Sequence, residues 1–228
     1  MNELRFTLLS DGSSDRALMP ILSWLLAECG VRVAIQEAWA ELRGRQPRSS
    51  QLAERVKLAL QWHPCDLLFV HRDAEKETLE VRKRQILEAI SALCLPSTPP
   101  AVCVVPVRMQ EAWLMFDEPA LRTAAGNPNN DTPLELPALA SVERLADPKD
   151  VLLGLMRRAS GFSGRRLRNF RPQPYRIVQL IDDFSPLRQL PAFQALEADL
   201  LETINANGWA ADAALTPPPS PPPAPDPD

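Results

Sequence analysis

Acidic side chains follow three separate apolar segments of the chain, each at the point where the segment ends. Asp11 and Asp15 follow the first segment, Asp73 and Glu75 follow the second, and Glu111 follows the third. Carboxylates gathered in one place repel one another, and a hard divalent cation such as Mg²⁺ is the usual reason for them to coexist. Such a cation can polarise a phosphoryl oxygen and activate a water molecule that a carboxylate deprotonates. If the three ends meet, these residues predict a Mg²⁺ (or Mn²⁺) site for chemistry on phosphates.

Each acid also has a structural explanation, because acidic side chains stabilise the first turn of a helix. That explanation suits Asp15 and Glu75 better than it suits Asp73. The chain has only two histidines, which excludes a histidine-rich zinc site. His71 adjoins the acidic residues and could be a metal neighbour, a proton carrier or a structural residue at a strand end. His63 lies beside a proline at a predicted helix end, and we expect it to be structural.

The first 108 residues alternate between two kinds of apolar segment. Four have the length and composition of strands: Leu4–Leu9, Val31–Ile35, Asp66–Val70 and Ala101–Val107. Three stretches between them have the apolar spacing of helices: Ser13 or Ser14 to about Cys29, Ser49 or Ser50 to Pro64, and Leu79 to Leu93. This alternation predicts an α/β fold with a mostly parallel sheet of about four strands flanked by helices. Ligands of such sheets bind at the carboxyl ends of the strands, where the acidic residues lie.

The second half of the chain has a different character. From Glu111 onward the strand-like segments stop, and helices are predicted, among them residues 147–159 and 191–206. We predict an α/β core over residues 1–108, a helical lobe over 109–212 packed on that core, and a proline-rich tail over 213–228. Eight of the 24 prolines lie in the last twelve residues. That composition forms neither helix nor sheet, so we expect an extended, mobile tail.

Several function classes lack their sequence patterns. The chain has no G-x-x-x-x-G-K-[ST] nucleotide loop, no G-x-G-x-x-G dinucleotide turn and no G-x-S-x-G nucleophile elbow. Its four cysteines form no C-x-x-C pair, so we expect reduced thiols and a cytoplasmic protein. No apolar run approaches the roughly 20 residues of a membrane helix.

Arginines are concentrated in one part of an acidic chain. The net charge is −4, but residues 151–181 contain seven arginines and no Asp or Glu. Guanidinium groups match the geometry of phosphates, so this segment predicts a nucleic-acid contact. We expect the contact to involve Arg165, Arg166, Arg168 and Arg171, with Phe162, Phe170 or Tyr175 available to stack on a base. Alternatively, these arginines form a solvated loop or pair with the acidic remainder of the fold.

The acidic segments together resemble the Toprim superfamily, the metal-binding fold of topoisomerases, primases and related nucleases. The resemblance lies in Leu8–Arg16, where a strand leads to an acid and a glycine, and in Leu67–Glu75, where a strand ends in paired acids. Residues 109–117, 124–128 and 147–149 are similar to a group of small bacterial Toprim-like proteins of unknown function. The resemblance covers roughly residues 3–160. It departs from the usual pattern at Asp11, where Toprim domains usually have glutamate. It also departs where they usually have Asp-x-Asp, because this chain has either His71-x-Asp73 or Asp73-x-Glu75.

The resemblance implies a Mg²⁺- or Mn²⁺-dependent nuclease acting on DNA or RNA. Asp11, Asp73 and Glu75 would hold the metal, Asp11, Asp73 and Glu111 would be catalytic, and Asp15 and His71 would support them. Small Toprim-like proteins of this kind look like companions of ATPases in bacterial defence systems, so an ATPase partner is a further expectation. The alternative is a catalytically inactive Toprim-like module that binds nucleic acid or a partner protein.

Overall fold

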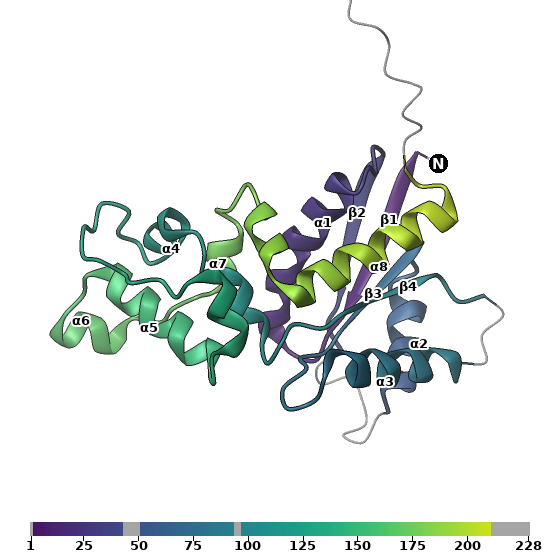
Figure 1. The fold of residues 1–228 in the computed structure, drawn as a ribbon, viewed down its shortest axis with the longest axis horizontal. Coiled ribbons are helices and arrows are strands. Elements are labelled where there is room, and N and C mark those ends of the chain that lie inside the picture. Colours follow the sequence, from purple (N-terminus) through teal and green to yellow (C-terminus); the bar gives the residue numbers. More distant parts are fainter. Residues whose placement is uncertain (1, 43–50, 94–96, 211–228) are drawn as a thin grey trace, which may run out of the picture.

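Four parallel strands form a single sheet, and both of its faces are covered by helices (Figure 1). The computed structural model describes residues 2–42, 51–93 and 97–210. The sheet has the order β2-β1-β3-β4, with strands at β1 (Glu3–Leu9), β2 (Ala34–Ala40), β3 (Leu67–His71) and β4 (Ala101–Val104). All three strand pairings are parallel. The predicted α/β fold, with its parallel sheet of about four strands and helical C-terminal part, is confirmed.

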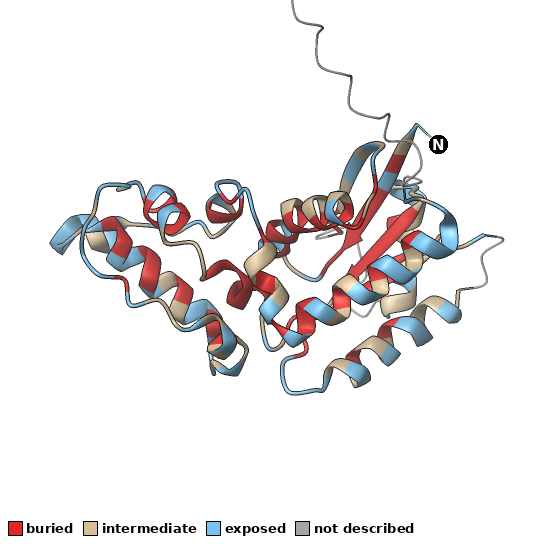
Figure 2. Cartoon of the chain, turned by 45° about the horizontal axis from the view of Figure 1, so that its top comes forward, coloured by how far each residue is buried: buried red, intermediate tan, exposed pale blue. Residues whose placement is uncertain are grey.

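The helices divide into two layers because successive strand residues point to opposite faces. Leu8 and Phe69 belong to the cluster beneath α1 (Leu18–Glu28) and α8 (Pro191–Asn207). Their neighbours Leu9 and Val70 belong to a second cluster, beneath α2 (Leu52–Trp62) and α3 (Leu79–Ser91). Every residue of β3 is buried, as expected of a strand covered on both faces (Figure 2).

The other elements extend from one end of the sheet. They comprise η1 (Ser13–Ala17), η2 (Gln110–Leu114), α4 (Glu118–Ala124), η3 (Leu139–Arg144), α5 (Pro148–Ser160), α6 (Gly164–Asn169), α7 (Tyr175–Val178) and η4 (Ser185–Gln189). Helices α4, α5 and α6 lie farthest from the sheet, on the left of Figure 1. Residues on both sides of position 108 contribute to the cluster beneath α1 and α8. Trp113 of η2, fully buried, packs edge to face on Phe193 of α8 with ring centroids 5.4 Å apart.

The second strand differs from its prediction. The apolar run at residues 31–35 suggested a strand there, whereas β2 covers Ala34–Ala40 and pairs with β1 over its whole length. Only one residue of this edge strand is fully buried, so exposed polar residues such as Gln36 and Glu37 are tolerated and no apolar run marks it. Val31 instead forms an isolated antiparallel bridge with Ala210. The last strand also ends early, at Val104.

Some predictions fall on residues that the structure does not describe. These are the start of the second helix at Ser49 or Ser50 and the tail at 213–228. Cys29, Cys65 and Cys103 are free thiols. Among the described residues, no helix combines the length and the apolar character needed to cross a membrane.

Because Trp113 joins η2 to α8, we expect Trp113→Ala to lower the free energy of unfolding by about 4 kcal/mol, as for other buried aromatic residues. Urea denaturation followed by circular dichroism measures the change. Leu201→Ala, at a side chain of α8 that is 40% exposed, is the control and should cost less than about 1 kcal/mol. One cooperative transition is expected in each case. Two separate transitions would show that the helical part unfolds independently of the sheet.

Candidate functional site

The strand order creates a crevice at the carboxyl edge of the sheet. β1 and β3 are neighbours, yet the chain leaves β1 through α1 on one face and leaves β3 through α3 on the other. Ligands of open α/β sheets bind at such a switch point. Asp15 lies on η1 just after β1, His71 is the last residue of β3, and Asp73 follows two residues later. Gln110 and Glu111 begin η2 after β4.

His71 is the centre of this group. Its ring is 2% exposed, and its Nδ1 lies 3.0 Å from the carbonyl oxygen of Val104 on β4. A carbonyl oxygen only accepts, so Nδ1 carries the hydrogen and a neutral ring has its lone pair on Nε2. That Nε2 lies 3.5 Å from Oδ1 of Asp73 and 3.9 Å from Oδ2 of Asp15. With a neutral ring, Nε2 and the two carboxylate oxygens would all be electron-rich and face one another, an arrangement that a proton or a metal ion would relieve.

The surroundings of Asp73 change the pKa of its carboxyl group. The pKa of its carboxyl group is raised to about 6, mainly by burial and also by the nearby Asp15 and Glu111, against the lowering effect of His71 and of a backbone hydrogen bond from Gln110. Its carboxyl group therefore keeps a proton to a higher pH than an ordinary aspartic acid does. Strongly perturbed carboxyl groups in a crevice are typical of functional sites.

Gln110 connects the two aspartates. Its backbone N–H donates to Oδ1 of Asp73 at 3.2 Å, and its side-chain Nε2 donates to Oδ1 of Asp15 at 2.9 Å. The other oxygen of Asp15 accepts from the backbone N–H of Gly12 at 2.6 Å. A Cβ at position 12 would lie only 3.2 Å from the Asp15 carboxylate, so the close approach favours glycine. Oε1 of Gln110 is buried and has no hydrogen-bond partner among the described residues.

Glu111 is buried beside this group, with 4% of its surface exposed. Lys149, on the first turn of α5, places its Nζ 3.8 Å from Oε1 of Glu111. The contact joins the start of α5 to the carboxyl edge of the sheet.

Two of the predicted metal ligands are placed differently. Asp11 makes an ion pair with Nη1 of Arg55 on α2 and lies 3.5 Å from Nε of Arg72. Glu75 is exposed and adopts a left-handed backbone conformation with φ 55°. Both line the same hollow as Asp15 and Asp73, about 280 Å³ in volume. The structure therefore brings Asp15, His71, Asp73 and Glu111 together and directs the Asp11 carboxylate to arginines.

The chemistry of the donors fits a hard divalent cation. Carboxylate and amide oxygens are ligands that Mg²⁺ or Mn²⁺ accepts. The imidazole of His71, whose other nitrogen is bound to a carbonyl, is a softer ligand that suits a transition metal better than Mg²⁺. The unpartnered Oε1 of Gln110 adds an oxygen without a role in the fold. As placed, however, no group of three or more His, Cys, Asp or Glu side chains in the described ranges could hold a metal ion. Small movements of side chains would be needed to complete such a site.

The predicted nucleic-acid residues lie on α6 and just after it. Arg165, Arg166, Arg168 and Arg171 are all exposed. Of the seven arginines in 151–181, only Arg158 forms an ion pair within the described part of the chain, with Glu135. The aromatic residues are less available than predicted, because Phe162 packs on Phe170 with centroids 5.5 Å apart and Arg166 covers Phe162.

Sequence reasoning missed Gln110, Arg72 and Arg82 as members of this site. Gln110 is the immediate neighbour of Glu111, and Arg72 lies between His71 and Asp73. Arg82 had a clearer indication, because it lies three residues after Leu79 and four before Ile86, on the apolar stripe of its helix.

Comparison of the chain with protein-family models, with curated proteins and with solved structures finds no match in any of the three. The site is therefore interpreted from its own geometry.

The raised pKa of Asp73 predicts that this carboxylate destabilises the metal-free protein. The folded state binds the proton up to about pH 6, whereas the unfolded state releases it near pH 4. The free energy of unfolding should therefore fall as pH rises from 4 to 7. Asp73→Asn should remove that dependence and raise stability at pH 7.5 by about 2 kcal/mol.

Urea denaturation in EDTA at pH 5 and pH 7.5 measures this effect. Asp66→Asn is the matched control, at the opposite end of β3. Arg5 lowers the pKa of Asp66, so this substitution should give no gain in stability. A destabilised Asp73→Asn variant at pH 7.5 would contradict the assignment.

Proposed function

We propose that the chain is a divalent-cation-dependent phosphodiesterase, a nuclease acting on DNA or RNA, with Asp15, His71 and Asp73 holding Mg²⁺ or Mn²⁺. The observation that carries the proposal is the position of His71, whose Nε2 faces two carboxylates while its Nδ1 binds Val104. The Toprim resemblance supports the same chemistry. The proposal replaces Asp11 and Glu75 as ligands by Asp15 and His71.

When bound, the cation would polarise a phosphoryl oxygen and make a water molecule more acidic. Hydrogen bonds from Gln110 hold Asp15 and Asp73 near each other, and side chains would move from these positions to bind the ion. Glu111 is buried and close to Lys149, and we assign it the role of accepting a proton from the attacking water. Asp11 is assigned a positioning role, because it orients Arg55 and Arg72 at the edge of the same hollow.

In this proposal, the substrate runs from the carboxyl edge of the sheet along α5 to the arginines of α6. Lys149 at the start of this helix contacts Glu111, and Arg165 and Arg168 follow its end. The 13 residues of α5 span about 20 Å. That length corresponds to about six base pairs at 3.4 Å each. A polymer substrate could therefore reach both places, whereas a mononucleotide could not.

The inactive module remains the second candidate. It is favoured by the ion pairing of Asp11 and by the absence, among described residues, of three side chains placed to hold a metal. Such a module would bind nucleic acid or a partner, an ATPase included, without a cation. The two candidates differ in whether Mn²⁺ binds and whether hydrolysis occurs.

Hydrolysis of bis(p-nitrophenyl) phosphate with Mn²⁺ tests the activity. We expect Asp15→Asn and Asp73→Asn each to lower kcat/KM by about 100-fold or more, since each removes a charged ligand. Asp66→Asn, at the other end of the sheet, should leave the rate within twofold. Metal-independent binding of oligonucleotides with no hydrolysis would instead establish the inactive module.

Salt dependence tests the arginine segment. Arg165→Gln and Arg168→Gln together should reduce the slope of log affinity against log salt by about 1.4 on single strands, or 1.8 on duplex DNA, if each contacts one phosphate. Arg158→Gln is the control, because Arg158 is already paired with Glu135. Oligonucleotides shorter than about six nucleotides should show no difference between the wild type and the double variant. An unchanged slope on long substrates would show that these arginines contact no phosphate.

A further inference from the structure

Two guanidinium groups line the hollow together with Asp15 and Asp73. Arg72 follows directly after β3, and Arg82 comes from α3. The Nε atoms of both are buried and form no hydrogen bond with a described residue, although Nε of Arg72 lies 3.5 Å from Oδ2 of Asp11 and so forms an ion pair with it. Buried donors are almost always satisfied in folded proteins, so two in one hollow require an explanation.

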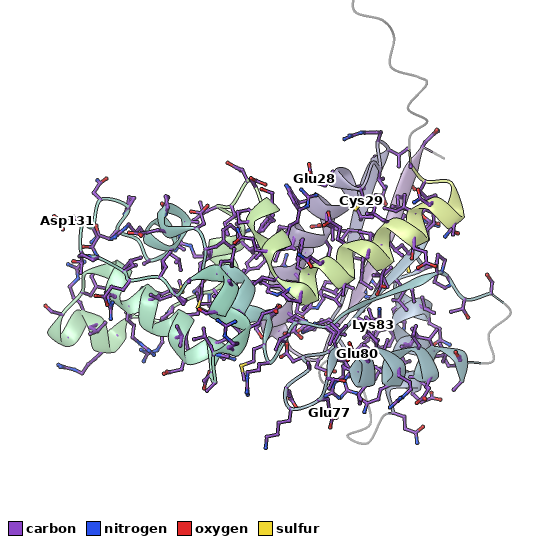
Figure 3. All side chains as sticks on the ribbon, in the orientation of Figure 1. Glu28, Cys29, Glu77, Glu80, Lys83 and Asp131 are labelled. Atoms are coloured by element: carbon purple, nitrogen blue, oxygen red, sulfur yellow. The ribbon has the colours of Figure 1, made fainter. Side chains whose placement is uncertain are left out.

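Among the basic residues of α3, Arg82 alone forms no ion pair with a described residue. Lys83 pairs with Asp199 of α8 at 2.5 Å, and Arg84 lies 3.9 Å from Glu88. Arg82 is only 8% exposed and yet has no carboxylate within ion-pair distance in the described part of the chain. Glu80 and Lys83, labelled in Figure 3, mark the half of α3 that carries it.

The contacts of Arg82 hold its position without neutralising its charge. Nη2 donates to the carbonyl oxygen of Ala74 at 3.2 Å, and Nη1 donates to Oε1 of Gln85 at 2.9 Å. Both acceptors are neutral. A buried cation without a counterion is costly, so its position favours an anion supplied from outside the chain.

We infer that Arg82, with Arg72 beside it, forms an anion-binding half of the hollow that seats a phosphoryl group. The inference rests on the proposed function, since the anion is taken to be the phosphate of the substrate. Guanidinium N–H groups match phosphate oxygens in geometry and in charge. A volume of about 280 Å³ is several times the roughly 30 Å³ that one water molecule occupies in the liquid, so a phosphoryl group has room there.

The test measures binding of inorganic phosphate without metal, so that it does not depend on hydrolysis. Asp73→Asn is used as the background, because removing this carboxylate reduces its repulsion of the anion. In EDTA at constant ionic strength, calorimetry should show phosphate binding to Asp73→Asn. Adding Arg82→Gln should raise the dissociation constant at least tenfold, and adding Arg72→Gln should raise it at least threefold. Arg84→Gln is the matched control on the same helix and should change it less than twofold.

Two results would overturn the inference: no phosphate binding to Asp73→Asn, or equal binding after Arg82→Gln. If the Arg82→Gln variant does not fold, the same phosphate-binding measurement is made on the Arg82→Lys variant. It keeps the charge but loses the planar fork, so phosphate binding should weaken at least threefold, and unchanged binding would overturn the inference. A wild-type protein that binds phosphate through Arg82 but hydrolyses no diester would refute the proposed nuclease and leave the anion site intact.

Discussion

The hydrogen bond between Nδ1 of His71 and the carbonyl oxygen of Val104 determines the character of the whole site. It joins β3 to β4 through a buried side chain at the carboxyl edge of the sheet. Because the carbonyl must accept, the ring is fixed with Nε2 toward Asp15 and Asp73. The fold thus places an imidazole nitrogen and two carboxylates, which accept hydrogen bonds from Gln110 and Gly12, where a parallel sheet binds its ligands.

The general architecture could be predicted from the sequence because burial leaves a strong pattern. β3 is an uninterrupted apolar run, and the apolar stripes of α1 and α3 have helical spacing. β2 was misplaced because an exposed edge strand needs no such pattern. The bounds of an element could therefore be predicted better the more deeply that element is buried.

The site could be predicted only as a region. Acidic residues after three strands predicted a group of carboxylates at the carboxyl edge of the sheet, where Asp15, Asp73 and Glu111 lie, but which carboxylate lies next to which depends on side chains from distant segments. Asp11 is paired with Arg55, 44 residues away, and Asp15 is held by Gln110, 95 residues away. No local pattern contains these pairings, since they follow from the strand order and from the position of α2.

Asp11 and Arg72 pair with each other in the hollow, but the opposite charges of Asp15 and Arg82 do not cancel. Asp15 is held by Gly12 and Gln110, and Arg82 by Ala74 and Gln85, so each is fixed by neutral groups. Within the described residues, no ion pair joins Arg82 to either aspartate, although all three line one hollow. Separated charges of this kind cost stability in the free protein, and they persist only where the surrounding contacts hold them apart. A cation bound together with a phosphate group carries both signs and would satisfy both halves at once. That complementarity is the physical reason for treating the acidic and the basic side chains as parts of one site.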